Sequence, residues 1–410
     1  MSAPRRASIA AIAGLALLAS GCSSKSSGAA APAATSGAAA VATSAAAAAP
    51  TTGAAAAAPT SAAGSAAPAS GGAVPPAIAA AGGTTLLTTA KPAGVEAQYG
   101  PVCKGSDLGI PKIDLKTATI GWAQSEKEAN PFRIESTKSQ KAEATKRGIH
   151  LITTNAQSNV QQENTDIKGM IDKGAKAIIF SPINSTGLGD AIAYAKSKHV
   201  AMIPVDRNIT GVKACQSVGP QLGSDFVQQG KRAADAMIKA TGGTANLLIL
   251  LGATGVNVTD DRTSGFLNEL AAQKATGIKI IAKQTADFTR EKGQSVTETE
   301  IKAHPEINAI YAENDEEGVG ALVALTDAGK NGTSKTHLVS IDGTKTAVQG
   351  VVDGNFDAVI ESNPAYGPAA EDALDAYVNG AGYPAVTITI DNAYLDKASA
   401  QAGITSGTAY

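Results

Sequence analysis

Residues 177–206 read AIIFSPINSTGLGDAIAYAKSKHVAMIPVD. The apolar run Ala177–Pro182 has the length of a strand, and after a helical segment a second apolar run follows at Val200–Asp206. Apolar runs without polar alternation are typical of strands whose two faces are both covered by helices. A strand, a helix and a second strand within about 30 residues predict parallel strands joined by a right-handed crossover.

The same alternation continues along most of the chain. Further strand-like runs are 117–124, 150–154, 245–251, 278–284, 307–313, 336–342 and 356–361. Helical patterns lie between them, such as the apolar face formed by Val160, Ile167 and Met170. The strands are too many for one doubly wound sheet, and the segment Cys215–Phe226 interrupts the rhythm. We therefore predict an α/β fold with two doubly wound parallel-sheet lobes.

Polar and aromatic side chains recur where the predicted strands end. They are Asn130, Phe132 and Arg133; Asp206, Arg207 and Asn208; Asp261 and Arg262; Asp287, Phe288, Thr289 and Arg290; Asn314 and Asp315; and Asp342. Ligands of such sheets bind beyond the carboxyl ends of the strands. Carboxylate and amide oxygens accept from vicinal hydroxyls, Arg and Asn donate to them, and Phe covers the C–H face of a sugar ring. The set predicts a site for a neutral polyol, with helix capping as the alternative for each Asp or Asn alone.

At these residues the chain resembles the type I periplasmic binding proteins that serve ABC importers for sugars, the group of ribose-, galactose- and galactofuranose-binding proteins. The matching motifs are NPFR at 130–133, PVDRNI at 204–209, TDDRTSGF at 259–266, ADFTREKG at 286–293, AEND at 312–315, SIDG at 340–343 and VVDGNFDA at 351–358. Each motif is weak alone, but their order and spacing together are specific. The resemblance extends from Ala118 to the C-terminus.

The resemblance implies which residues bind the ligand and how the lobes are joined. It implies contacts from the N-terminal lobe by Asn130, Phe132, Arg133, Asp206 and Arg207, and from the C-terminal lobe by Arg262, Phe288, Asn314 and Asp342. The family fold is a flytrap whose lobes are joined by a three-strand hinge and close on the ligand. The implied N-terminal lobe is 101–220 plus 363–390, and the C-terminal lobe is 221–362 plus 391–410.

The function implied by the resemblance is that of an extracytoplasmic solute-binding protein. A monomer would capture a galactofuranose-, galactose- or pentose-like monosaccharide between its lobes and deliver it to an ABC permease and ATPase. Arg133 favours the galactofuranose-like branch, because ribose binders tend to carry a second Phe there. A sensor that presents the sugar to a membrane receptor is the alternative. A regulator of the lactose-repressor type shares the lobes but needs an N-terminal helix-turn-helix, which this sequence does not show.

The sequence argues against an enzyme. GLG at 187–189 and GVG at 318–320 each follow a strand and begin a helix, but both lack the third glycine and the acidic residue of a dinucleotide-binding loop. The sequence has no P-loop, GxSxG or HExxH motif, and its four His residues are scattered. We therefore predict a binding protein without catalytic residues, cofactor or metal site.

Charge and cysteine content narrow the possible partners. The chain has 410 residues and a formal net charge of −2, which gives no electrostatic footprint for nucleic acid. After Leu18 no apolar run approaches the ~18 residues of a membrane helix. The chain has three cysteines. If Cys22 carries a lipid, Cys103 and Cys215 remain as an even pair in a protein expected outside the cytoplasm, so we predict a disulfide between them. Two free buried thiols are the alternative.

The first residues have the layout of a bacterial lipoprotein signal. Arg5 and Arg6 provide a positive region, and Ile9–Leu18 is an apolar segment too short to span a bilayer. Small residues then lead to Cys22 and resemble a lipobox, although Ala19 stands where Leu is commoner. We predict a signal peptide at 1–21 and a lipid anchor at Cys22 on the outer face of the cell membrane, which is the only membrane contact expected. An ordinary secretory signal is the alternative.

A segment of low complexity follows Cys22. From Ser23 to about Thr89 it consists almost entirely of Ala, Ser, Gly, Thr and Pro, and Lys25 is its only charge. So few branched apolar and aromatic side chains cannot offset the conformational entropy that is lost on ordering. We predict that residues 22–100 form a disordered Ala/Ser/Gly/Pro tether that holds the lobes away from the membrane. A low-complexity insertion without function is the alternative.

Replacing Cys22 tests the lipid anchor. We expect the Cys22→Ala protein to be released into the medium or to stay uncleaved, because the predicted lipid is the only anchor. Cell fractionation, with detection of the protein in membrane and medium, measures the outcome. Membrane retention of a correctly processed Cys22→Ala protein at the wild-type level would contradict the prediction.

Overall fold

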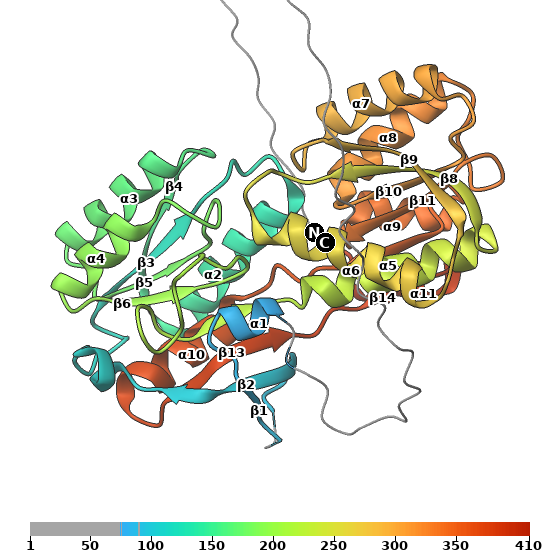
Figure 1. Ribbon diagram of the computed structural model, residues 1–410. Helices are drawn as coiled ribbons and strands as arrows, with labels where there is room; N and C mark the ends of the chain where they lie inside the picture. The colour runs from blue at the N-terminus through green and yellow to red at the C-terminus, as the bar shows by residue number, and fades with distance from the viewer. Residues whose placement is uncertain (1–73, 75, 89–90) are drawn as a thin grey trace, which may run out of the picture. The chain divides into compact units, whose positions relative to one another are not determined.

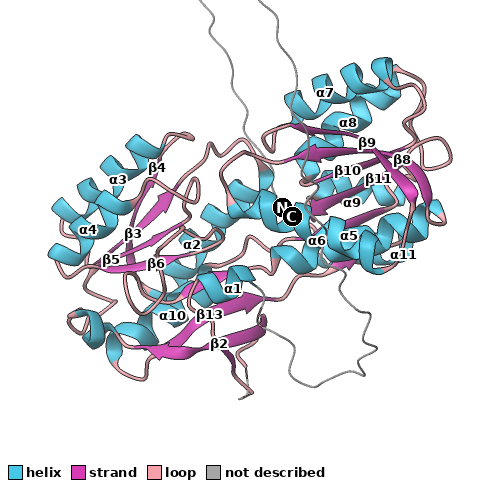
Figure 2. Cartoon of the chain, in the orientation of Figure 1, coloured by secondary structure: helices cyan, strands magenta, loops and turns pink. Residues whose placement is uncertain are grey.

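The computed structural model describes residue 74, residues 76–88 and residues 91–410, which belong to one compact unit. The predicted signal peptide, Cys22 and the predicted tether as far as residue 73 lie outside the described residues. In the described part, helices cover parallel sheets in two lobes, which confirms the predicted α/β fold (Figure 1 and Figure 2). No helix of this part combines the length and the apolar character needed to cross a membrane.

The N-terminal lobe contains a parallel sheet in the order β4-β3-β5-β6. Its strands are β3 (Thr119–Gln124), β4 (His150–Asn155), β5 (Ala177–Phe180) and β6 (Ala201–Pro204), and its crossover helices are α2 (Pro131–Arg147), α3 (Val160–Asp172) and α4 (Gly189–Ser197). Neighbouring side chains of β5 serve opposite faces: Ile179 packs in the core on the α2 side, whereas Ile178 and Phe180 pack in the core beneath α3 and α4. Because both faces are covered, the strands are continuously apolar.

The C-terminal lobe contains a six-stranded sheet in the order β14-β12-β11-β10-β8-β9, in which the β14 edge is antiparallel. Its strands are β8 (Thr244–Leu251), β9 (Gly277–Thr285), β10 (Ala309–Ala312), β11 (His337–Asp342), β12 (Ala358–Glu361) and β14 (Ala393–Tyr394). One face is covered by α5 (Phe226–Thr241) and α6 (Asn257–Ala272), and the other by α7 (Arg290–Ala303), α8 (Asp315–Asp327), α9 (Lys345–Val352) and α11 (Lys397–Ser406).

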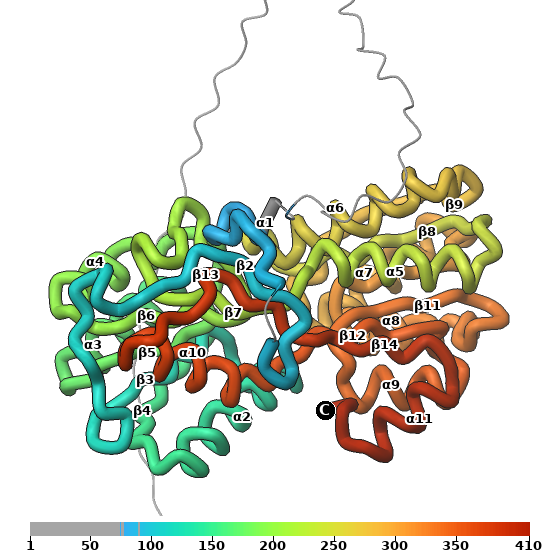
Figure 3. The backbone as a smooth tube through the Cα atoms, turned by 90° about the horizontal axis from the view of Figure 1, so that it is seen from below, coloured from blue at the N-terminus to red at the C-terminus, as the bar shows by residue number. Residues whose placement is uncertain are grey.

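Three segments cross between the lobes, as the resemblance implied. They follow β7 (Gln221–Gly223), β12 and β13 (Tyr383–Thr389), and they lead to α5, to α10 (Gly367–Asn379) and to β14. Figure 3 shows the third crossing, where the chain runs from β13 to β14. β7 pairs in parallel with β13, and Leu222 bridges to Val205 of the N-terminal lobe. The first lobe boundary therefore lies after Gly223 rather than at residue 220.

The range predicted as tether contains regular structure near its end. It includes α1 (Pro76–Ala80), β1 (Thr85–Leu86) and most of β2 (Val95–Cys103), which leads to the 3-10 helix η1 (Gly105–Leu108). β2 is antiparallel to both β1 and β13. The tether prediction was therefore wrong for these elements, because β13, the partner that orders β2, lies near the other end of the chain.

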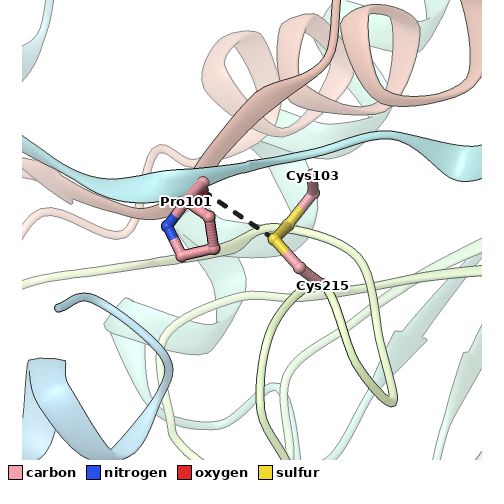
Figure 4. The surroundings of a disulfide bond; sticks show 3 residues. All are labelled: Pro101, Cys103 and Cys215. Carbon is pink, nitrogen blue, oxygen red and sulfur yellow. Dashed lines mark hydrogen bonds between the residues drawn. A yellow bond between two sulfur atoms is a disulfide. The ribbon is translucent and has the colours of Figure 1, made fainter. Parts of the chain in front are cut away.

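A disulfide joins β2 to the loop between β6 and β7. Cys103 and Cys215 are bonded across a sequence separation of 112 residues, and the Sγ atom of Cys215 lies 3.8 Å from the carbonyl oxygen of Pro101 (Figure 4). Cys103 is buried in the core of the N-terminal lobe. The bond therefore attaches the first long strand covalently to a loop of the same lobe.

Removing the disulfide should lower the stability of the fold. Closing a loop of about 100 residues stabilises a protein by at most about 4.7 kcal/mol in the chain-entropy treatment, and measured losses are commonly about 2–4 kcal/mol. We expect a loss of that size in the unfolding free energy of the double variant Cys103→Ala/Cys215→Ala, measured by denaturant unfolding. Alkylation of the unreduced wild-type protein followed by mass spectrometry is the control, and two alkylated cysteines would contradict the bond.

Candidate functional site

A small cavity lies between the lobes, at the carboxyl ends of their parallel strands. It is lined by Glu126, Asn130, Phe132, Arg133, Asp206 and Arg207 from the N-terminal lobe and by Val258, Arg262, Phe288, Asn314 and Asp342 from the C-terminal lobe. All nine residues predicted to contact the ligand belong to this lining, and Glu126 and Val258 are additional.

Two of the lining residues are also helix caps. The Oδ1 atom of Asn130 accepts a hydrogen bond from the backbone N–H of Phe132 at 2.9 Å, at the start of α2. The Oδ1 atom of Asn314 accepts from the backbone N–H of Glu317 at 2.9 Å, within a capping box that begins α8. Capping, which was the alternative for single residues, is thus their local role. It also holds both side chains at the cavity wall.

The backbone adopts unusual conformations at three lining positions. Asp206, Phe288 and Asp342 have φ angles of +68°, +58° and +148°, a region that residues other than glycine rarely adopt. Such strain persists only where the surrounding structure holds it, and it is common at ligand sites. The Phe288 ring in turn requires glycine beside it, because a Cβ atom at Gly252 would lie 2.0 Å from the ring.

Arg133 is the centre of a buried ion-pair network in the N-terminal lobe. Its Nη1 atom lies 2.7 Å from Oδ2 of Asp206, and its Nε atom lies 2.7 Å from Oε2 of Glu126. Arg207 pairs with the other oxygen of Glu126 through Nη2 at 2.8 Å. Burial raises the pKa of Glu126, but the two guanidinium groups outweigh it and lower this pKa to about 2. Glu126 therefore stays ionised and compensates both arginines.

Arg262 holds the corresponding position in the C-terminal lobe. Its Nε atom donates to Oε1 of Gln229 at 2.9 Å, its Nη1 atom donates to the carbonyl oxygen of Glu313, and its Nη2 atom lies 3.3 Å from Oδ1 of Asp342. Burial raises the pKa of Asp342 to about 8, although Arg262 acts in the opposite direction. Two of these three partners, the amide oxygen of Gln229 and the backbone carbonyl of Glu313, are neutral acceptors. Arg133, by contrast, pairs with two carboxylates.

Phe132 and Phe288 contribute aromatic surface from opposite lobes. The guanidinium carbon of Arg133 lies 4.9 Å from the centroid of the Phe132 ring. The guanidinium carbon of Arg207 lies 5.9 Å from the centroid of Phe288, which belongs to the other lobe. A cation within about 6 Å of a ring centroid is attracted to the ring, so this contact draws the two lobes together.

The cavity offers hydrogen bonds in both directions without a large excess of charge. Its three guanidinium groups face the carboxyl groups of Glu126, Asp206 and Asp342. A ring with several hydroxyls can donate to carboxylates, accept from guanidiniums and lay its C–H face on a phenylalanine. Within the described ranges, no group of three or more His, Cys, Asp or Glu residues could hold a metal ion.

The lobes also contact each other directly outside the cavity lining, through four residues that we call the interlobe latch: Ser185, Asn208, Gly255 and Asn257. The backbone N–H of Ser185 donates to the carbonyl oxygen of Gly255 at 2.9 Å, and its Oγ atom accepts from the backbone N–H of Asn257 at 2.9 Å. The backbone N–H of Asn208 donates to Oδ1 of Asn257 at 2.9 Å. Separating the lobes would break these bonds, so the structure represents a closed arrangement.

Some of these residues were missed at the level of sequence. Glu126 stands two residues after β3 ends and follows the same strand-end rule as the others, so the rule could have found it. Ser185 and Asn257 carry no such signal, because their partners belong to the opposite lobe. Asn208 was noted only as a polar residue at a strand end.

Comparison with known proteins identifies the family. The family model described as "Periplasmic binding protein domain" matches residues 121–382. The ribose import binding protein of Bacillus subtilis is 32% identical over 266 residues, which are 65% of this chain and 83% of that protein. The galactofuranose-binding protein of Escherichia coli is 32% identical over 282 residues, which are 68% of this chain and 87% of that protein.

Solved structures agree with this result. The crystal structure of a galactofuranose binding protein has a TM-score of 0.67 and 30% identity, covering 72% of this chain and 100% of that chain. The binding protein of the arabinose ABC transporter from Shewanella sp. ANA-3 has a TM-score of 0.67 and 29% identity, covering 70% and 95%. The matched family consists of binding proteins, which confirms the prediction that the chain is not an enzyme. Since the family model covers more than half of its residues, this chain belongs to the periplasmic binding protein family.

Proposed function

We propose that the chain is the sugar-binding component of an ABC importer and that it captures one neutral monosaccharide between its lobes. The observation that carries this proposal is the cavity, where buried guanidiniums, carboxyls and phenylalanine rings meet from both lobes. A ring with several hydroxyls fits this mixture better than a charged or an apolar ligand. The relatives support it, since they are named for ribose and galactofuranose.

The expected ligand can be specified further than a monosaccharide of any kind. We propose a galactofuranose-, galactose- or pentose-like ligand and rank furanose rings first. Three similar structures with 29–30% identity are described with galactofuranose, β-D-fucofuranose and arabinofuranose. The position of Arg133, which pairs with both Glu126 and Asp206 at the cavity wall, is the feature of this chain that supports the same ranking.

The place of the protein follows from the proposed importer. A solute-binding protein acts outside the cytoplasm, where it delivers its sugar to the permease and ATPase. We propose that a lipid on Cys22 holds this chain at the outer face of the cell membrane as a monomeric lipoprotein. Cys22 itself lies outside the described residues.

A thermal-shift screen tests the binding function. Ligand that binds only the native state raises stability by about 2.7 kcal/mol at a concentration of 100 times Kd. The panel would contain galactose, arabinose, ribose and fucose, with glucose 6-phosphate and glutamate as charged controls. A shift with a charged control and with none of the neutral sugars would contradict the proposal.

Conservative changes on both sides of the cavity test the lining. Asn at position 206 cannot compensate Arg133, and Lys at position 262 lacks the planar fork of Arg. An unpaired buried partner costs about 1–3 kcal/mol. We therefore expect Asp206→Asn and Arg262→Lys each to raise the Kd of the cognate sugar about fivefold to 150-fold in titration calorimetry.

The matched control for these variants is Asp327→Asn, which changes an exposed carboxylate at the end of α8. It should leave the Kd unchanged. Circular dichroism and thermal unfolding establish that all three variants are folded. Wild-type affinity in a folded Asp206→Asn protein would show that the residue does not face the ligand.

The interlobe latch should slow the release of sugar without selecting it. Ser185→Ala removes one hydrogen bond between the lobes, which is worth about 0.5–1.5 kcal/mol. We expect dissociation about two- to tenfold faster in stopped-flow measurements, and an unchanged ratio of affinities for two sugars. Ser295→Ala, at an exposed site on α7, is the control. A changed preference between the sugars would mean that Ser185 contacts the ligand instead.

A further inference from the structure

The three segments that cross between the lobes meet at one buried carboxylate. Asp391 lies in the segment between β13 and β14, and its Oδ1 atom accepts from Oγ of Ser224 at 2.9 Å in the first crossing. The same oxygen accepts from the backbone N–H of Asn363 at 3.0 Å in the second crossing. Asp391 is 8% exposed. Its side chain therefore joins all three crossings at the point where the lobes must rotate.

The second oxygen of Asp391 connects the hinge to the cavity. Oδ2 accepts a hydrogen bond from Nε2 of Gln229 at 2.8 Å, and Oε1 of Gln229 accepts from Nε of Arg262 at 2.9 Å. Gln229 is buried between the two charged groups, at 1% exposure. One amide thus separates the hinge carboxylate from a guanidinium that lines the cavity.

Close helix packing holds this amide in place. Gln229 is on α5 and Arg262 is on α6, and a Cβ atom at Gly230 would lie 2.1 Å from the carbonyl oxygen of Arg262. A Cβ atom at Gly265 would meet the backbone of Val227 at 2.1 Å. The two helices therefore approach through glycine at both points, and Gln229 has little freedom to move away from Arg262.

We propose that Asp391 and Gln229 are positioning residues for the sugar site: the ionised Asp391 orients the amide of Gln229, and this amide orients Arg262. This inference rests on the proposed function only where sugar affinity is the measured effect. Neither Asp391 nor Gln229 lines the cavity.

The two neighbours of Gln229 fix the orientation of its side-chain amide. An ionised carboxylate only accepts hydrogen bonds and a guanidinium only donates them, so a single orientation of Gln229 satisfies both neighbours. Its NH₂ group faces Asp391 and its oxygen faces Arg262. Without an acceptor at Asp391 the amide can turn, and it then presents a donor to the Nε–H of Arg262. That contact is repulsive, and Arg262 loses one of its two neutral acceptors.

Burial makes the ionisation of Asp391 sensitive to pH near neutrality. Burial raises the pKa of Asp391 to about 7, against the hydrogen bonds from Gln229, Asn363 and Ser224, and Glu361 raises it further. Arg232 donates to the backbone carbonyl oxygen of Asp391 at 2.9 Å, and the phenol of Tyr366 also faces it. Acidification through neutral pH therefore protonates Asp391. Because Oδ1 already accepts from Ser224 and Asn363, the proton is placed on Oδ2, where it opposes the NH₂ group of Gln229.

Protonation of Asp391 does not by itself unfold the protein, so unfolding does not explain a loss of sugar affinity that this group causes on acidification. A carboxyl whose pKa is raised in the native state binds its proton more tightly there than in the unfolded chain. Between the ordinary value of 3.8 and about 7, this group alone makes the fold relatively more stable as the pH falls. A loss of affinity in that window with unchanged or higher stability is therefore a signature of positioning.

The test is a pH titration of the Arg262 Nε–H signal by ¹H–¹⁵N NMR in the protein without sugar. The wild-type signal should shift with a midpoint near neutral pH, and Asp391→Asn should remove the part of that step that Asp391 contributes. Asp342 and Glu313 contact Arg262 and titrate in a similar range, so the comparison of variants is needed to assign the step. Asp375→Asn, at an exposed site on α10, is the matched control and should behave as wild type.

Sugar affinity supplies the second readout. At pH 8 both Gln229→Met and Asp391→Asn should bind the cognate sugar about tenfold more weakly, since a hydrogen bond to a charged group is lost. The double variant should be no weaker than Gln229→Met alone, because the two residues act in series. If Asp391→Asn fails to fold, Gln229→Met alone should flatten the NMR step.

The outcomes separate this inference from the proposed function. A neutral-pH step that persists unchanged in both variants overturns the positioning role, whatever sugar binds. Additive losses of affinity in the double variant overturn it as well. If the wild-type protein binds no sugar, the proposed function fails, while the NMR titration still decides whether Asp391 controls Arg262.

Discussion

Burying three guanidinium groups between two lobes is the constraint on which the rest of the structure depends. Arginine cannot give up its proton inside a protein, so each buried guanidinium needs acceptors around it. Arg133 obtains them from Glu126, Asp206 and the hydroxyl of Ser181, and Arg207 from Glu126 and the backbone carbonyl oxygen of Ile183. Arg262 depends on an amide, a backbone carbonyl and one carboxyl. The N-terminal half of the cavity therefore holds its guanidinium groups mainly with carboxylates, and the C-terminal half holds Arg262 mainly with neutral acceptors.

The parts of the fold that repeat locally could be predicted from the sequence. Each strand is a short local pattern, so the alternation of strands and helices was accessible without a structure, and the family resemblance then implied which of the polar residues after the strands line the cavity. β2 was not, because its partner β13 lies at the far end of the chain. Gln229 is an ordinary residue within a helix, and it acquires a role only because α5 and α6 approach at Gly230 and Gly265. Properties created by packing between distant segments leave no local pattern.

Closure is shared between weak and strong contacts. The interlobe latch consists of backbone and hydroxyl hydrogen bonds that water can replace on opening, so each contributes only about 0.5–1.5 kcal/mol. Such bonds bias the equilibrium toward the closed form but leave the lobes able to separate. A ligand that pairs with groups of both lobes binds the closed form more tightly than the open form, and this difference in binding free energy shifts the equilibrium further toward closure. Capture and release therefore both remain possible, as transport requires.

The N-terminal end of the described structure is attached to one lobe. β2 pairs with β13 in the N-terminal lobe, and the Cys103–Cys215 disulfide ties it to the loop before β7. The start of β2 also touches the third crossing, because the backbone N–H of Ile390 donates to the carbonyl oxygen of Gly94 at 3.0 Å. The C-terminal lobe also contacts this strand directly, because Nη2 of Arg232 on α5 lies 3.7 Å from Oε1 of Glu96 on β2. The first long strand of the described structure therefore touches both lobes and one crossing segment, so it lies where a rotation of the lobes would be felt.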